Sequence, residues 1–263
     1  MRDWKNAIYG LAIGDAMGVP YEFRSRGTFN CSKMIGYGTH NQPRGTWSDD
    51  TAMTLATAKS IKDNSGRINI SDIKRNFLNW MINGKFTIDD YVFDIGNTTW
   101  QALKKGKPCT DERSNGNGSL MRILPLAFID CTDNEIRKVS AITHGHEIAM
   151  EACVIYVHIA KQLLNSEVLQ LDYPKPFDRL KYIKDLSVND IKSSGYVIDT
   201  LESSLWSLYH GRNLKDVILK AVNLGDDTDT TGAVAGGLAG IVYNVNPFLY
   251  RQLRGKDVIK SCI

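Results

Sequence analysis

Apolar residues recur every three or four positions along most of the chain, a spacing typical of helices with one buried face. In residues 197–209, for example, Val197, Leu201, Leu205 and Leu208 fall on one stripe. Equivalent patterns predict helices over residues 6–19, 51–63, 70–83, 98–105, 132–143, 147–165, 197–209, 214–223 and 230–243. No alternation of apolar and polar residues is long enough to predict a sheet, and no linker or repeat divides the chain. We therefore expect an all-α fold and a single domain over residues 1–263.

The first and the last long helical segments carry glycine at four-residue intervals. The first contains Gly10, Gly14 and Gly18, and the last contains Gly232, Gly236 and Gly240. Glycine costs about 1 kcal/mol relative to alanine at each helical position, so six glycines in register need a structural reason. A stripe of small residues lets two helix backbones approach closely. We expect both segments to lie at the centre of the domain, where they could pack against each other.

The composition describes an ordinary globular chain and excludes several classes of protein. Hydrophobic residues make up 43% of the sequence and charged residues 23%, which excludes collagen-like and intrinsically disordered proteins. The 32 basic and 29 acidic residues leave a net charge of +3, too small to predict a nucleic-acid-binding surface. The five cysteines form no C-x-x-C pair, so we expect neither a zinc site nor a disulfide framework, and a cytoplasmic location. The longest apolar stretches, residues 7–14 and 233–242, fall short of the roughly 20 residues that span a membrane.

Two segments rich in carboxylates and hydroxyls run directly into predicted helices. One reads TWSDDT over residues 46–51, and the other reads NLGDDTDTT over residues 223–231. Helix capping would explain one or two residues in each, because their oxygens accept hydrogen bonds from free N–H groups. Several carboxylates at one helix end, however, repel one another unless a cation neutralises them. Such oxygens suit Mg²⁺ or Mn²⁺, so two converging clusters would form a two-metal site that activates water.

A third segment, SNGNGSLMR over residues 114–122, lies between the two acidic segments. Gly116 and Gly118 allow the backbone to present N–H groups in a concave loop, with Ser119 opening a short helix. Such a loop holds anions, phosphates above all, and an ordinary Asn-Gly turn is the alternative. The segment is not a P-loop, because no Gly-Lys-Ser/Thr follows it.

Histidines near the helix at residues 147–165 give a weaker signal. His144 and His146 precede this helix, but without further His or Cys nearby they make a poor zinc site. We consider a ligand-contacting role and a purely structural role equally plausible for His144. Within the helix, we expect His158 and Cys153 to be core residues.

Six motifs occur in order along the chain. They are GLAIGDAMGVPYE at residues 10–22, GTWSDDTAM at 45–53, GNGSLMR at 116–122, Thr143-His144, GYVIDTL at 195–201 and GDDTDTTGAVA at 225–235. In this order they resemble the ADP-ribosylglycohydrolases related to dinitrogenase reductase-activating glycohydrolase. Each match is modest alone, but together they span most of the chain and are specific.

The resemblance implies an all-helical orthogonal bundle with a dinuclear Mg²⁺ or Mn²⁺ centre in a cleft. Carried over by position, the metal ligands would be Ser48, Asp49, Asp50, Asp227, Asp229 and Thr230. The diphosphate would be held by Asn117, Gly118 and Ser119, and the ADP-ribose pocket would be lined by His144 and Tyr196. Glu22 matches an acidic residue that in some relatives touches the metal or gates the cleft. One departure is Asp226, which stands where many members have glycine; we expect it to point outward or to cap the helix.

The expected function is metal-dependent removal of ADP-ribose from a modified protein, with arginine as the favoured linkage. Asp49 and Asp50 would stabilise the reacting sugar, and Glu22 would orient water or act as acid–base. One alternative is an immunity-type protein that binds ADP-ribose and occludes an ADP-ribosyltransferase toxin. A second alternative is a hydrolase of small ADP-ribose derivatives. The expected partners are ADP-ribosylated protein and ADP-ribose, with neither nucleic acid nor membrane as primary ligand.

Overall fold

The computed structural model of the protein describes residues 3–263, and these residues contain helices but no strands. The helices are α1 (Lys5–Gly18), α2 (Asp49–Asp63), α3 (Ile70–Asn83), α4 (Asn97–Lys105), α5 (Asp133–Ser140), α6 (Glu147–Leu164), α7 (Val197–His210), α8 (Leu214–Val222), α9 (Thr228–Val242), α10 (Pro247–Gln252) and α11 (Lys256–Cys262). Short 3₁₀ turns such as η1 (Val19–Tyr21), η2 (Gly38–His40) and η4 (Asn117–Ser119) punctuate the connections. The all-α prediction is confirmed.

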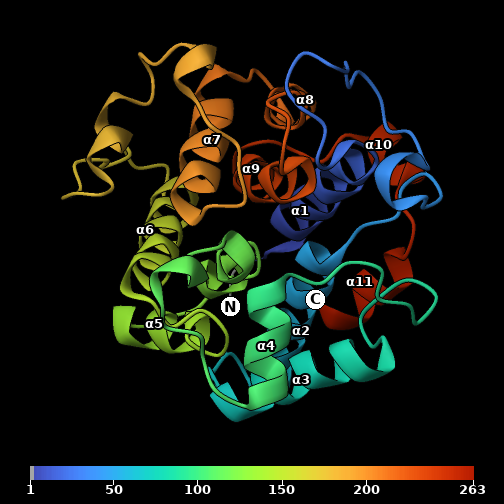
Figure 1. Ribbon diagram of the computed structural model, residues 1–263, viewed down its shortest axis with the longest axis vertical. Helices are drawn as coiled ribbons and strands as arrows, with labels where there is room; N and C mark the ends of the chain where they lie inside the picture. Colours follow the sequence, from blue (N-terminus) through green and yellow to red (C-terminus); the bar gives the residue numbers. More distant parts are fainter. Residues whose placement is uncertain (1–2) are drawn as a thin grey trace.

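Helices α1 and α9 lie against each other at the centre of the fold, with their glycines in contact (Figure 1). A methyl group at Gly232 would lie 2.6 Å from the carbonyl oxygen of Gly14, closer than real Cβ contacts. Methyl groups at Gly10, Gly14 and Gly240 would likewise overlap the backbone of the facing helix. The two glycine-bearing segments are therefore central and paired, and the glycines are needed because no side chain fits between the two backbones.

The remaining helices surround this pair. Helices α7 and α8 pack against α9, α2 packs against α1, and α3 packs against α2. Helix α6 contacts α9 and α7, and α5 packs on α6. In Figure 1, α7 stands upright while its neighbour α8 is seen nearly along its axis, so these two helices cross steeply. This arrangement agrees with the orthogonal bundle that the family resemblance implies, and it brings the first turns of α2 and α9 together beside α1.

The predicted helices all occur, but some boundaries differ. Helix α2 begins at Asp49 instead of residue 51, and α9 begins at Thr228 instead of residue 230, because the acidic segments form the first helical turns. Helix α5 ends at Ser140, three residues before the predicted end. Helices α10 and α11 were not predicted, because their 6 and 7 residues are too few to show a helical period.

Helix α6 corrects one side-chain prediction and confirms another. The expectation that His158 is a core residue is wrong, since its side chain is 38% exposed and its Nε2 lies 2.7 Å from Asp133 Oδ1. His158 follows Glu151 by seven positions and so shares the outer face of the helix with that half-exposed carboxylate. Cys153 is buried, as expected. Within residues 3–263, no helix combines the length and the apolar character that crossing a bilayer requires.

Candidate metal centre and binding cavity

The first turns of α2 and α9 bring the two acidic segments together. The predicted metal ligands all lie at these two helix ends: Ser48, Asp49, Asp50, Asp227, Asp229 and Thr230. The Thr230 hydroxyl donates to Asp50 Oδ2 across the junction, at 3.4 Å. Asp50 and Asp229 are each only 1% exposed. The two acidic segments therefore lie together in the fold.

Asp15 of α1, which the sequence analysis missed, provides the cap of α2. Its carboxylate accepts hydrogen bonds from the backbone N–H of Ser48 at 2.9 Å, from that of Thr51 at 3.0 Å and from the Thr51 hydroxyl at 2.6 Å. The Ser48 side chain makes no capping bond and instead donates to Asp50 Oδ2 at 3.1 Å. Helix capping therefore does not explain Asp49 and Asp50, because Asp15 already performs it.

Several carboxylate oxygens in the cluster are buried without a partner. Asp50 Oδ1, Asp227 Oδ1 and Asp229 Oδ2 accept no hydrogen bond from any described residue. Carboxylate oxygens of Asp15, Asp50 and Asp229 lie within 4.8 Å of one another. Buried charges of one sign are costly unless they are neutralised. The unpaired oxygens, all hard donors, fit a divalent cation such as Mg²⁺ or Mn²⁺.

The electrostatics of the cluster point the same way. Burial raises the pKa of Asp15 to about 6. Burial, reinforced by neighbouring carboxylates, raises the pKa of Asp49, Asp50 and Asp229 well above the ordinary range of an aspartate. Without a cation these groups resist ionisation, and a cation that neutralises them removes this penalty.

A second group of possible ligands lies beside the first. Glu22, His40, Asp94 and Asp229 each offer an atom, and these atoms lie within 4.8 Å of one another. Glu22 follows η1, His40 ends η2, and Asp94 precedes α4, so the group joins loops that are far apart in the sequence. His40 Nε2 pairs with Glu22 Oε2. Burial raises the pKa of Glu22 to about 7, and the hydrogen bond to Glu22 raises the pKa of His40.

A cavity of about 330 Å³ opens onto these groups. Its acidic wall comes from Glu22, Asp49, Asp94, Asp227 and Thr230. The rest of its lining includes the loop and helix ends Gly96–Thr99, Gly116–Gly118, His144 and Gly195. Ser48, Asp50 and Asp229 are not part of the lining and lie in the buried cluster behind the acidic wall. The cavity is therefore bordered both by the acidic cluster and by the Gly116–Gly118 loop.

The loop at residues 114–122 departs from expectation in one detail. The 3₁₀ turn begins at Asn117 instead of opening at Ser119. The Ser119 side chain is fully buried, 2.9 Å from Ser140 Oγ, and does not face the cavity. Asn117 does reach the site, because its amide nitrogen donates to Asp227 Oδ2 at 2.7 Å and to Thr200 Oγ1 at 2.9 Å. The loop is therefore tied directly to the acidic cluster.

Tyr196 and Asp226 lie at the edges of the site. Tyr196 pairs with Gly116 through a backbone bridge, but the residue is 38% exposed and is not part of the cavity lining. Asp226 is exposed, as expected, and has a φ of 57°. This left-handed conformation is the one that glycine adopts freely and that aspartate tolerates better than most residues. It explains why either residue suits this position.

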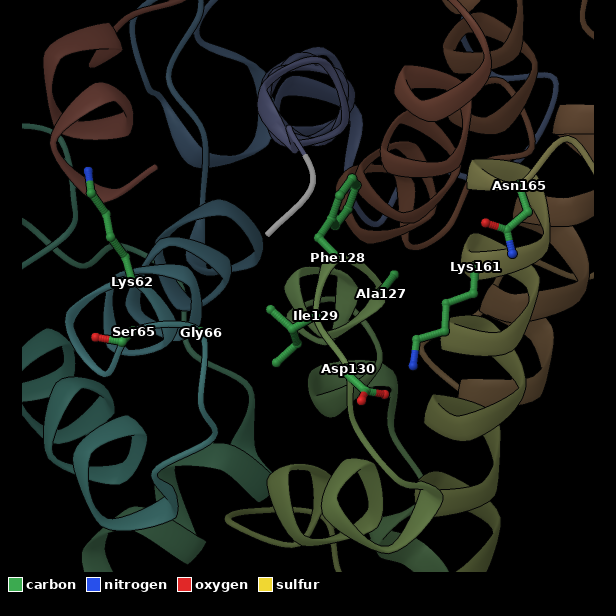
Figure 2. A pocket seen from close by; sticks show the side chains of 9 residues that line it. All are labelled: Lys62, Ser65, Gly66, Ala127, Phe128, Ile129, Asp130, Lys161 and Asn165. Carbon is green, nitrogen blue, oxygen red and sulfur yellow. The ribbon is translucent and has the colours of Figure 1, made fainter.

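A larger cavity, of about 670 Å³, lies elsewhere in the molecule (Figure 2). Figure 2 shows Lys62 on one side, Lys161 on the other, and Phe128, Ile129 and Asp130 between them. None of the predicted site residues lines this cavity, and Asp130 is the single carboxylate in its lining. The smaller cavity, with its converging carboxylates, is the better candidate for chemistry.

Comparison with known proteins gives consistent results. The sequence profile of the family described as ADP-ribosylglycohydrolase matches residues 3–261. ADP-ribosylarginine hydrolase Tri1 of Pseudomonas putida (strain GB-1) is 33% identical over 264 residues, which cover 92% of this chain and 71% of that protein. Tri1 of Serratia proteamaculans (strain 568) is 34% identical, with 91% and 71% covered. ADP-ribosyl-[dinitrogen reductase] glycohydrolase of Rhodospirillum rubrum is 30% identical, with 91% and 85% covered.

A solved structure shares the fold over nearly its whole length. A chain described as an ADP-ribosylglycohydrolase-related protein complex superposes with a TM-score of 0.80 at 27% identity. The match covers 98% of this chain and 94% of the other.

Proposed function

Because the chain belongs to the ADP-ribosylglycohydrolase family, we propose that it hydrolyses the bond between ADP-ribose and a modified arginine of a protein. The names of the Pseudomonas and Serratia relatives support arginine as the linkage. The observation that carries the proposal is the set of unpaired, buried carboxylate oxygens beside a cavity that the Gly116–Gly118 loop also lines. One ligand with a diphosphate and vicinal hydroxyls could contact both the loop and the carboxylates.

The cation ligands in this proposal are the predicted six, Ser48, Asp49, Asp50, Asp227, Asp229 and Thr230. Two divalent cations, Mg²⁺ or Mn²⁺, would neutralise these carboxylates and lower the pKa of a bound water. Asp15 holds the first turn of α2 through the Ser48 and Thr51 backbone, so the carboxylates of that turn are not needed to cap the helix.

The substrate would lie across the cavity. Asn117, Gly118 and Ser119 would contact the diphosphate, with Ser119 contributing its backbone only, because its hydroxyl faces Ser140. His144 would line the same end, and the exposed ring of Tyr196 would cover the edge. The ribose would then face the acidic wall, where its hydroxyls can contact oxygen ligands.

Glu22 is the side chain best placed for proton transfer. Its Oε2 pairs with His40, which leaves Oε1 for a water or the substrate in the cavity. Burial raises the pKa of Glu22 to about 7, so the carboxyl can hold or release a proton near neutral pH. Asp49 and Asp94 line the same wall and would stabilise positive charge that develops on the sugar.

The test offers arginine-, serine- and acetyl-linked ADP-ribose separately to the purified protein with Mg²⁺ or Mn²⁺. We expect free ADP-ribose from the arginine-linked substrate and none after addition of a chelator. Release from the serine or acetyl adduct alone would overturn the choice of arginine. Release from none of them, with or without metal, would overturn the hydrolase proposal.

A variant separates hydrolysis from mere binding. The double change Asp49→Ala, Asp50→Ala should abolish release of ADP-ribose from the arginine-linked protein. If this variant still protected a target protein from an ADP-ribosyltransferase at a one-to-one ratio, occlusion of the toxin would be the better account. Cleavage of small ADP-ribose derivatives but not of modified protein would favour the remaining alternative.

A further inference from the structure

The two ring nitrogens of His144 have different surroundings. His144 is 2% exposed and lines the cavity. Its Nδ1 lies 2.8 Å from the Thr143 hydroxyl oxygen. Its Nε2 side lies against the glycine loop, 3.3 Å from where a Cβ of Gly118 would stand, and no described residue hydrogen-bonds to Nε2. The open nitrogen is thus the one available to a ligand.

Arg122 fixes the hydrogen-bonding state of Thr143. The Arg122 side chain is fully buried and donates from Nη2 to Thr143 Oγ1 at 2.8 Å and from Nε to the Gly118 carbonyl at 3.1 Å. Its guanidinium lies over the Phe77 ring, 4.3 Å from the centroid. A guanidinium can only donate, so Thr143 Oγ1 must accept this bond.

The hydroxyl proton of Thr143 then has one destination. Thr143 is fully buried, and among residues 3–263 the side-chain hydrogen-bond partners of its Oγ1 are Arg122 and His144. If His144 Nδ1 carried a proton and donated it, the Thr143 proton would be left unpaired in the interior, which is costly. If Thr143 donates to Nδ1, the Thr143 hydroxyl and His144 Nδ1 both have partners, and the neutral ring carries its proton on Nε2, where it is available to a ligand.

We propose that Arg122 and Thr143 are positioning residues that hold His144 as the neutral tautomer with its proton on Nε2. The ring then presents a fixed N–H donor to a phosphate or ribose oxygen of ADP-ribose. This inference rests on the proposed function, because it takes ADP-ribose as the ligand of the cavity. Beyond that function, it specifies that His144 donates a hydrogen bond to the ligand from Nε2, and that Arg122 and Thr143 set this direction.

The charge distribution around the cavity supports this arrangement. No carboxylate of the described residues forms an ion pair with Arg122, so its positive charge is not cancelled locally. Because Arg122 binds Gly118 and Thr143, this charge lies directly behind the part of the cavity lining that Gly118 and His144 form. Burial, with Arg122 as the second cause, lowers the pKa of His144 to about 3, so the ring stays neutral when the protein is folded. The anionic part of a ligand is therefore favoured at the His144 end.

The first experiment compares Thr143→Val with Thr143→Ser in the metal-loaded protein. Valine keeps the shape of threonine but loses the hydroxyl, whereas serine keeps the hydroxyl and loses a methyl group. We expect Thr143→Val to weaken ADP-ribose binding about fivefold to tenfold in calorimetry, and Thr143→Ser to stay within about twofold of the parent. Equal affinities of the Val variant and the parent would overturn the positioning role.

The second experiment reads the tautomer directly, and the parent protein alone can overturn the inference. Long-range ¹H–¹⁵N correlation spectra of the imidazoles distinguish a protonated Nε2 from a protonated Nδ1, and His144→Gln assigns the signal among the five histidines. We expect His144 to carry its proton on Nε2 in the parent and in Thr143→Ser. A proton on Nδ1 in the parent would overturn the inference. If the parent itself failed to bind ADP-ribose, the proposed function would fail instead, whatever the tautomer.

Discussion

At the residue scale, Asp226 and Asp229 are three positions apart and occupy opposite environments. Asp229 is 1% exposed beside Asp15 and Asp50, whereas Asp226 is exposed on the surface. We predict that Asp229→Asn lowers cation-dependent release of ADP-ribose more than about a hundredfold, because it removes a ligand charge. The same change should stabilise the metal-free protein by about 1 kcal/mol or more, since it removes a carboxylate that burial and its neighbours disfavour.

The matched control for Asp229→Asn is Asp226→Asn. It makes the same chemical change three residues away and should alter neither the activity nor the thermal stability measurably. Activity assays with and without chelator and thermal melts in chelator would test both variants. Equal effects of the two changes would show that the buried cluster does not hold the cation.

The residues of the site differ in how far the sequence predicts them. The two acidic segments are recognisable because they place more carboxylates at a helix start than capping needs. Asp15 is also conspicuous in the sequence, because it is the one charged residue in the apolar part of α1. Its role as a cap could not be predicted, because it depends on a contact with Ser48, which is distant in the sequence. His40 and Asp94 lie in irregular segments, where no periodicity indicates which side chains turn inward.

At the scale of elements, the contact between α1 and α9 decides the effect of adding a methyl group. Helix propensity alone predicts that Gly14→Ala stabilises the protein by about 1 kcal/mol. The methyl group would instead overlap the backbone at Gly232, which cannot move aside without separating the helices. We predict that Gly14→Ala lowers the free energy of unfolding by about 3 kcal/mol or more, measured by chemical denaturation.

Gly237, on the same helix α9, provides the comparison. The close neighbours of a methyl group there are the ends of two side chains, Leu124 Cδ2 at 2.7 Å and the Tyr156 hydroxyl at 3.1 Å, and Leu11 Cβ lies at an ordinary 3.7 Å. These atoms can shift, so Gly237→Ala should stay within about 1 kcal/mol of the parent. A stabilised Gly14→Ala would contradict the tight pairing of α1 and α9.

The glycine loop offers a second pair of matched changes. A methyl group at Gly118 would lie 2.9 Å from His144 Cε1 and 3.1 Å from Thr99 Oγ1, whereas one at Gly116 has no neighbour closer than 3.7 Å. We predict that Gly118→Ala displaces the His144 ring and weakens ADP-ribose binding about tenfold, and that Gly116→Ala has a smaller effect. Calorimetry with ADP-ribose would measure both, and cation binding should be unchanged. A larger loss in Gly116→Ala would mean that the loop contacts the ligand in another way.

Elements with a long apolar period could be predicted well, and short ones could not. Helices α1 to α9 follow from periodicity, and the glycine stripes predict which two are central. Helices α10 and α11 and the 3₁₀ turns could not be predicted, because one or two helical turns are too short to repeat the apolar pattern. The turn η4 depends on its ties to α7 and α9 through Asn117, which are not local in sequence.

At the scale of the whole molecule, the buried carboxylates make stability depend on pH in a definite direction. The pKa of Asp15 is raised from 3.8 to about 6 and that of Glu22 from 4.5 to about 7. A group whose pKa is higher in the folded state contributes stability below its unfolded value, and this contribution is lost as pH rises through the folded value. We predict that the metal-free protein loses thermal stability between about pH 4 and pH 8.

Melting curves in chelator across this pH range would measure the loss. Addition of Mg²⁺ or Mn²⁺ at pH 8 should restore stability, because a cation bound to the folded state neutralises the carboxylates. A melting temperature that does not fall with rising pH in chelator, or that the cations leave unchanged, would argue against a cation at this cluster.

The assignment of residues 1–263 to a single domain stays a prediction.

The glycine contact between α1 and α9 has a consequence for the choice of ion. Gly18 of α1 lies against the backbone of Asp229, and Asp15 of the same helix binds the backbone of Ser48 and Thr51, so α1 fixes both turns that carry the proposed ligands. Side chains can rotate to enlarge a site, but two main chains in direct contact cannot separate without breaking the core. Mg²⁺ binds oxygen at roughly 2.0–2.1 Å and Ca²⁺ at about 2.3–2.6 Å, with more ligands. A cluster held by such rigid walls would select by ionic radius, and the helix pairing itself would exclude the larger ion.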